Sequence, residues 1–168
     1  MVDELDARIL RLLTDEPRVG VLEASRRLDV ARGTVQARLD KLMATGVVRT
    51  LAPSIDPASM GYRVTAFATL EIRQGGRESV AEHLARIPEV LEVHTITGPG
   101  DLLCRIVARD NDDLQRVIDD LVSDADIVRT STLIALSTVV APRVLPLVAA
   151  AVDTPGADPP PGRRSRAS

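Results

Sequence analysis

Hydrophobic residues in the first part of the chain recur at spacings of three and four in three short stretches. Residues 5–13, 22–28 and 35–43 each place their apolar positions on one side of a helix, so each predicts an amphipathic helix. Pro17 disfavours helix in the residues before it, and Gly46 is a frequent helix stop. The pattern therefore predicts three short helices in succession.

The third predicted helix is followed by the apolar residues 47–51, which predict a short strand. Three helices and a strand are typical of a winged helix-turn-helix, and we assign residues 1–50 to this domain. Pro53 and Pro57 punctuate the next residues, so we interpret residues 51–62 as a linker.

The next segment changes to a period of two, which predicts a strand. Further along, two helical patterns alternate with three more strand patterns, separated by Gly and Pro. The elements expected are strands in 64–72, 90–97, 102–108 and 127–140, and helices in 80–87 and 114–121. The order β-α-β-β-α-β is that of a ferredoxin-like domain, with both helices on one face of an antiparallel sheet. The chain is thus expected to be an α+β protein, with this second domain at residues 63–140.

The C-terminal part has two segments of different composition. Residues 141–152 are apolar and predict a C-terminal extension, either a final helix or an added strand. Residues 153–168 are rich in Pro, Gly, Ala and Arg and are expected to be a disordered, dispensable tail.

The net charge of −3 conceals an asymmetry. Residues 18–49 contain seven basic and three acidic side chains, whereas residues 61–153 contain nine basic and fourteen acidic ones. A basic patch on an acidic chain can still attract nucleic-acid phosphates. Aromatic residues make up only 1% of the chain, which argues against single-strand binding, because that mode stacks bases on aromatic rings.

The sequence indicates a cytoplasmic protein with no membrane segment. Cys104 is the only cysteine, so no intrachain disulfide can form. The first residues are acidic and contain no apolar stretch of the kind found in a signal peptide. No apolar run approaches the ~20 residues that span a bilayer.

The third predicted helix is the candidate for DNA recognition. A helical wheel places Val35, Leu39 and Leu42 on the core face, and small and basic residues on the opposite face. The candidate DNA-binding residues are Arg32, Gly33, Thr34, Ala37, Arg38 and Lys41. Small side chains allow close approach to a major groove, and cations can reach phosphates or guanine edges. The alternative is an ordinary three-helix bundle with a polar outer face.

Several motifs together resemble those of the Lrp/AsnC transcriptional regulators, over residues 3–140. These are Leu5-Asp6 with Ile9-Leu10, Asp15 with Arg18, the run from Leu28 to Leu42, Thr45 to Val48, Ile55-Asp56-Pro57 with Met60-Gly61-Tyr62, Pro88-Glu89-Val90, Thr97 to Asp101, and Val128 to Thr132. The resemblance implies binding to double-stranded DNA at pseudo-palindromic operators. It also implies a C-terminal domain that binds a small effector, commonly an amino acid, and forms homodimers that often assemble into octamers.

Two residues depart from the family pattern. Ala31 stands where the family often has Ser, so the usual N-cap of the recognition helix is missing, and Thr34 is an alternative cap one turn later. Gly100 stands where an aromatic residue is common. We expect the extra room at Gly100 to favour a bulky apolar or aromatic amino acid.

The turn at residues 98–101 is the candidate effector site, together with the last strand. Its glycines expose backbone N–H groups that suit a carboxylate, and its Asp can bind an ammonium group. The candidate effector-binding residues are Gly98, Gly100, Asp101, Thr132, Leu133 and Ile134. The alternative is that this turn is only a tight hairpin between two central strands, with Asp101 capping its own backbone.

Little else in the sequence indicates chemistry. His83, His94 and Cys104 show no metal-ligand spacing, and we expect no metal, no cofactor and no catalytic residue. Two alternatives remain at this stage. One is a tetrapyrrole decarboxylase, as a few Lrp/AsnC-like proteins are, and the other is an effector-binding protein without DNA binding.

Overall fold

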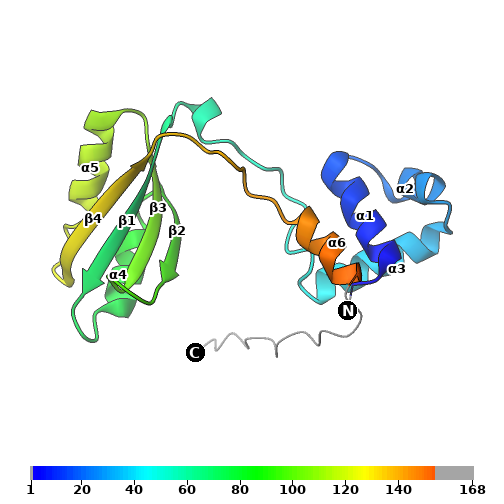
Figure 1. The fold of residues 1–168 in the computed structure, drawn as a ribbon, viewed down its shortest axis with the longest axis horizontal. Helices are drawn as coiled ribbons and strands as arrows, with labels where there is room; N and C mark the ends of the chain where they lie inside the picture. Colours follow the sequence, from blue (N-terminus) through cyan, green and yellow to red (C-terminus); the bar gives the residue numbers. More distant parts are fainter. Residues whose placement is uncertain (1, 154–168) are drawn as a thin grey trace. The chain divides into compact units, whose positions relative to one another are not determined.

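The computed structural model describes residues 2–153, which form two units (Figure 1). Among the described residues, the first unit combines 2–54 with 141–153, and the second is Ile55–Val140. The 153–168 tail predicted from composition lies outside the described residues, apart from Asp153.

The first unit contains the three predicted helices, α1 Glu4–Asp15, α2 Val21–Leu28 and α3 Arg32–Ala44. α1 begins with a capping box. The Asp3 carboxylate accepts the Asp6 N–H at 2.9 Å, and the Asp6 carboxylate accepts the Asp3 N–H at 3.2 Å. Buried apolar side chains from all three helices form the core: Ile9, Ala24, Leu28, Val35 and Leu42. The helical periodicity was thus sufficient to predict these three helices.

The predicted strand at 47–51 is not formed. Val48 donates its N–H to the Leu42 carbonyl at 3.0 Å, so the chain turns back on the end of α3. Val47 and Leu51 are exposed, and no other strand pairs with them. An isolated apolar run without a partner strand has no ladder to join, and the wing of the predicted winged motif is absent from the described residues.

The apolar segment after Pro142 forms helix α6, Leu145–Asp153, which contacts α1 (Figure 1). Four half-buried residues follow a helical spacing and form the side of α6 that packs against the unit. They are Leu145, Val148, Ala149 and Val152. The helix alternative for this segment is confirmed. The segment belongs to the first unit rather than extending the second.

The second unit is a four-stranded antiparallel sheet with two helices on one face (Figure 1). Its elements are η1 Ala58–Met60, β1 Val64–Ile72, α4 Arg77–Ala85, β2 Val90–Thr95, β3 Leu102–Ala108, α5 Asn111–Leu121 and β4 Ile127–Ala135. The strand order is β2-β3-β1-β4, as expected for the ferredoxin-like arrangement. β2 is therefore an edge strand, which corrects the expectation that the turn at 98–101 joins two central strands.

The core of this unit lies between the sheet and the helices. Ala66, Ala68 and Leu70 of β1 are completely buried there, together with Leu84 of α4 and Val117 of α5. The opposite face of the sheet has no covering helix in the second unit. On that face Phe67 is 38% exposed and its β4 partner Leu133 is 69% exposed.

Candidate functional site

The exposed face of α3 is where the sequence predicted it. Val35, Leu39 and Leu42 are buried. The opposite face presents five predicted residues to solvent: Arg32, Gly33, Thr34, Ala37 and Lys41. α3 starts at Arg32 with Ala31 as its N-cap and no capping side chain, so the alternative start at Thr34 is wrong. The first N–H groups of a helix lack intrahelical acceptors, and an uncapped start leaves them available to a phosphate.

Arg38 is held differently from the other predicted DNA-binding residues. Its Nη1 pairs with the Asp3 carboxylate and lies 3.3 Å from Oδ1 of Asp6, whose side chain is completely buried. The Asp3 hydrogen bond and charge hold the pKa of Arg38 above its usual value. Arg38 thus ties α3 to the start of α1, and its role as a phosphate contact stays a prediction.

Sequence reasoning missed Asp6 as a partner of this cluster. The signal was present, because Asp3 and Asp6 have the spacing of a capping box just before an apolar run. That spacing predicts the backbone bonds at the start of α1. It does not predict an arginine 32 residues further along the chain.

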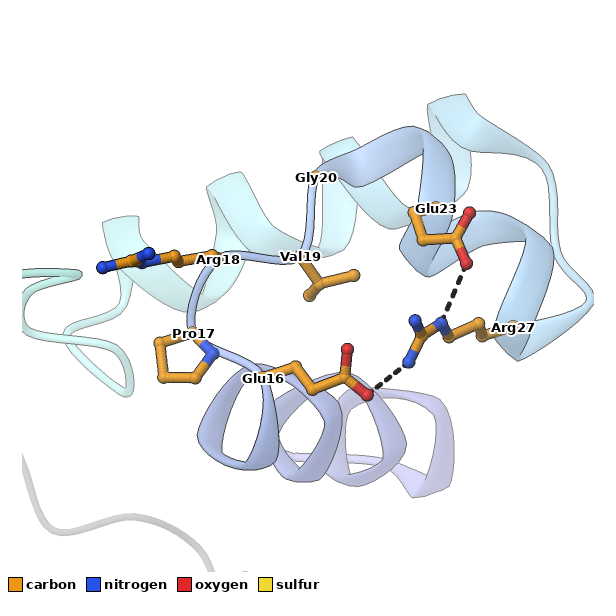
Figure 2. A pocket seen from close by; sticks show the side chains of 7 residues that line it. All are labelled: Glu16, Pro17, Arg18, Val19, Gly20, Glu23 and Arg27. Carbon is orange, nitrogen blue, oxygen red and sulfur yellow. Dashed lines mark hydrogen bonds and ion pairs between the residues drawn. The ribbon is translucent and has the colours of Figure 1, made fainter.

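Not all of the basic patch is free to bind an anion. Arg27 pairs with Glu16 and, through Nε at 2.9 Å, with Glu23 (Figure 2). These residues line a shallow depression of about 580 Å³ at the α1–α2 connection, and their carboxylates disfavour phosphate there. Figure 2 shows Arg18 pointing away from this group. Arg27 is therefore already paired with carboxylates, whereas Arg32 and Lys41 of α3 are exposed.

We expect Lys41→Ala to weaken operator binding several-fold and to lower the slope of log K against log salt by about 0.9, because one phosphate contact is lost. Lys41 is exposed on the outer face of α3, so the protein should unfold at the wild-type temperature. The measurement is a fluorescence-anisotropy titration at several salt concentrations. Arg11→Ala, which removes an exposed cation from α1, is the control and should change neither quantity. An unchanged slope in Lys41→Ala would remove this residue from the interface.

The turn at 98–101 is fastened to the end of β1. The Asp101 N–H donates to the Leu70 carbonyl at 2.8 Å, and the Asp101 carboxylate accepts the Ile72 N–H at 2.9 Å. Gly98 and Gly100 have φ of 114° and 97°, a region that favours glycine. A hairpin is present, but Asp101 binds the β1 backbone instead of capping its own turn, and its carboxylate can accept a further hydrogen bond.

The expectation of extra room at Gly100 is wrong. A Cβ added there would lie 2.7 Å from Cγ2 of Thr69 and 3.1 Å from the Leu70 carbonyl oxygen. The space is filled by β1, and glycine is needed because the turn packs directly on that strand. Gly100 therefore provides no space for a bulky effector.

The two halves of the predicted effector site lie along neighbouring stretches of β1. Thr132, Leu133 and Ile134 pair with Ala68, Phe67 and Ala66 of β1. The turn contacts β1 at Leu70–Ile72. The nearest of these positions, Ala68 and Leu70, are two residues or roughly 7 Å apart along the strand.

The remaining candidate residues are structural or exposed. Cys104 is completely buried in β3, and burial raises the pKa of its thiol to about 11, so it is an unreactive core residue. His83 lies on α4 and His94 on β2. Residues 2–153 contain no cluster of three metal-ligating side chains, and none of their helices is long and apolar enough to cross a membrane.

Comparisons with known proteins match both units. Residues 2–49 match the winged helix-turn-helix DNA-binding family, and residues 65–145 match the Lrp/AsnC ligand binding domain. An uncharacterized HTH-type transcriptional regulator of Pyrococcus abyssi is 35% identical over 138 residues, which are 82% of this chain and 87% of that relative.

Solved structures agree with this result. The structure of Escherichia coli AsnC has 26% identity and a TM-score of 0.80, covering 87% of this chain and 99% of its own. A transcriptional regulator of Neisseria meningitidis, solved in complex with L-Met, has 27% identity and a TM-score of 0.76, covering 84% of this chain and 94% of its own.

Together, the exposed α3 face and these matches define a DNA-binding transcriptional regulator with a separate ligand-binding domain. The chain belongs to the Lrp/AsnC family. The relatives are transcription regulators and not enzymes, so the decarboxylase alternative is dropped. The alternative without DNA binding is dropped for the same reason.

Proposed function

We propose that this regulator binds a pseudo-palindromic operator as a homo-oligomer and that an apolar amino acid is its effector. The observation that carries the DNA-binding mode is the outward face of α3, which is exposed, built from small residues and cationic at Arg32 and Lys41. Small residues allow the helix backbone to approach the major groove, and the two cations are placed to contact the strands beside it.

Assembly of the second unit is proposed from the uncovered face of its sheet. Phe67 of β1, Leu103 of β3 and Leu133 of β4 share that face, because paired residues of antiparallel strands point to the same side. An antiparallel sheet can keep one face in water, but large apolar side chains exposed on that face favour burial against a partner. A second copy of the chain, related by two-fold symmetry, would cover this face and would match a pseudo-palindromic operator.

The effector is proposed from the ligand-binding domain and from the relative solved with L-Met. The turn and Thr132–Ile134 contact neighbouring stretches of β1, and we infer that a second copy completes the site between them. Within this site, Asp101 would bind the ammonium group of the amino acid, and the aliphatic side chains of β4 would contact its apolar part.

Isothermal titration against the twenty amino acids tests the effector proposal. We expect an apolar amino acid to bind and Asp101→Asn to weaken its binding by about tenfold or more, because a charge-assisted hydrogen bond is lost. Asparagine can still accept the Ile72 N–H, so the hairpin should stay folded. Asp119→Asn, a change at an exposed residue of α5, is the control. Undiminished binding by Asp101→Asn would show that this turn is only structural.

A further inference from the structure

We infer that Arg8 of α1 is a positioning residue for DNA binding, because it holds the turn that sets the direction of α3. This inference rests on the proposed contact of α3 with DNA and names a residue outside α3 on which that contact depends. Nη2 of Arg8 donates to the main-chain carbonyl of Leu28 at 2.8 Å, although the two residues are 20 positions apart in the chain. Leu28 is the last residue of α2, so this bond fastens the end of α2 to α1.

The turn beside this bond is short. Only residues 29–31 lie between α2 and α3. The Val30 N–H donates to the Ser25 carbonyl at 3.1 Å, which closes the last turn of α2. The last carbonyls of a helix have no N–H of the same helix to accept, and Arg8 supplies a donor to the one at Leu28. With so few residues in between, a change in the path of the turn changes the direction of α3.

The turn itself has weak local stabilisation. Asp29 has φ 55° and ψ 50°, and it is the only residue other than glycine with a positive φ among residues 2–153. Aspartate tolerates this left-handed conformation better than most residues, but glycine adopts it without strain. At the other end of the turn, Ala31 has no side chain that can cap α3. The turn thus lacks both a glycine and a capping side chain, and its geometry depends on the bond from α1.

The charge of Arg8 suits this role. The C-terminal end of a helix carries a partial negative charge, which attracts a cation, and a charged donor makes a stronger hydrogen bond than a neutral one. No carboxylate among residues 2–153 forms an ion pair with Arg8, so its guanidinium is directed to the α2 carbonyl. Arg11, three residues further along α1, is exposed and forms no ion pair or side-chain hydrogen bond within the same residues. Arg11 is therefore a matched control.

The test is a fluorescence-anisotropy titration of the full-length protein with two duplexes, the DNA upstream of its own gene and an unrelated duplex of the same length. We expect Arg8→Gln to lower the affinity for the first duplex by about tenfold, because a misdirected α3 loses base contacts. The affinity for the unrelated duplex and the slope of log K against log salt should not change, since both depend on phosphate contacts. Arg8→Lys keeps a charged donor and should recover part of the loss, and Arg11→Gln should bind like the wild type.

Two further measurements test the physical reason. In the DNA-free protein, the amide hydrogen of Val30 should exchange about tenfold faster in Arg8→Gln than in the wild type, as followed by NMR, and at the normal rate in Arg11→Gln. Asp29→Gly removes the strain from the turn. The loss of operator affinity caused by Arg8→Gln should therefore be smaller when it is combined with Asp29→Gly than when it is made alone.

The outcomes separate this role from the alternatives. Equal weakening on both duplexes, with the salt slope lowered by about 0.9, would make Arg8 a phosphate contact and overturn the positioning role. Wild-type affinity and exchange in Arg8→Gln would overturn it as well, while leaving recognition by α3 intact. If Arg8→Gln does not fold, Arg8→Lys decides: weaker binding to the first duplex alone supports the role, and wild-type binding to both overturns it. A wild-type protein that binds both duplexes equally overturns the proposed recognition by α3 itself.

Discussion

Replacing Arg38 with alanine is expected to lower the thermal stability of the first unit and to weaken operator binding together. The Asp6 carboxylate is completely buried, and Arg38 is the cation beside it. Leaving a buried carboxylate without its partner destabilises the fold. Because the Arg38 side chain is about one third exposed (32%), water can reach part of the cluster and reduces this loss. DNA binding weakens because α3 loses its tie to the start of α1.

Thermal unfolding followed by circular dichroism measures this effect, and Asp6→Asn completes a double-mutant cycle. The double variant should lose less stability than the sum of the single variants, because the two changes remove one shared interaction. Arg26→Ala, which removes an exposed arginine of α2 with a long 3.8 Å contact to Glu23, should leave stability nearly unchanged. If Arg38→Ala instead unfolds at the wild-type temperature and lowers the salt slope by about one, Arg38 is a phosphate contact and not a structural tie.

The cluster of Asp3, Asp6 and Arg38 also determines how the stability of the first unit changes with pH. The Asp6 N–H bond, with further contributions from Arg38, lowers the pKa of Asp3 below its usual value. A carboxylate whose pKa is lowered in the folded state stabilises the protein at pH values above the ordinary pKa of Asp. This contribution is lost as the pH falls through the lowered pKa. Arg38→Ala should therefore show a smaller loss of stability on acidification than the wild type, with the difference confined to that acidic range.

Leu133→Asp is expected to convert the oligomer into monomers of 18.0 kDa. Leu133 is 69% exposed on the uncovered face of the sheet and lies directly opposite Phe67 in the β1–β4 register. A carboxylate there would introduce a charge beside the apolar Phe67 at the proposed interface, which disfavours association. The monomer should still fold, because Leu133 contributes nothing to the core beneath the sheet.

Light scattering coupled to size-exclusion chromatography measures the mass directly. Leu147→Asp is the matched control, since Leu147 of α6 is 68% exposed but belongs to the other unit. It should leave the oligomer intact. If Leu133→Asp retains the wild-type mass, the oligomer forms through another surface. If the wild-type protein is itself monomeric at micromolar concentration, the proposed assembly is wrong.

Local patterns were sufficient to predict most of the secondary structure. Helical spacing located α1, α2 and α3, and the period of two located β1 with its buried side at Ala66, Ala68 and Leu70. These features depend on near neighbours in sequence, so a single sequence contains the information. The exposed outer side of α3 follows from the same periodicity.

The parts that failed depend on contacts between distant residues. Residues 47–51 have strand composition but no partner strand, and pairing cannot be read from composition. Arg38 was interpreted from the helical wheel alone, which shows its direction on α3 but not the carboxylates of α1 that it meets. Gly100 was interpreted as free space because a missing side chain suggests room, whereas β1 occupies that space. Each error concerns which other segment comes close, and only the folded chain supplies that information.

We propose above all that α3 of this regulator recognises specific DNA and that an amino acid changes the binding. A gel shift with the DNA upstream of the protein's own gene, with unrelated DNA as competitor, measures the first part, and repeating it with each amino acid measures the second. We predict a shifted complex that unrelated DNA does not displace, that Lys41→Ala weakens, and whose affinity or mobility at least one apolar amino acid alters. A shift that unrelated DNA removes equally well, and that neither Lys41→Ala nor any amino acid changes, would contradict the account.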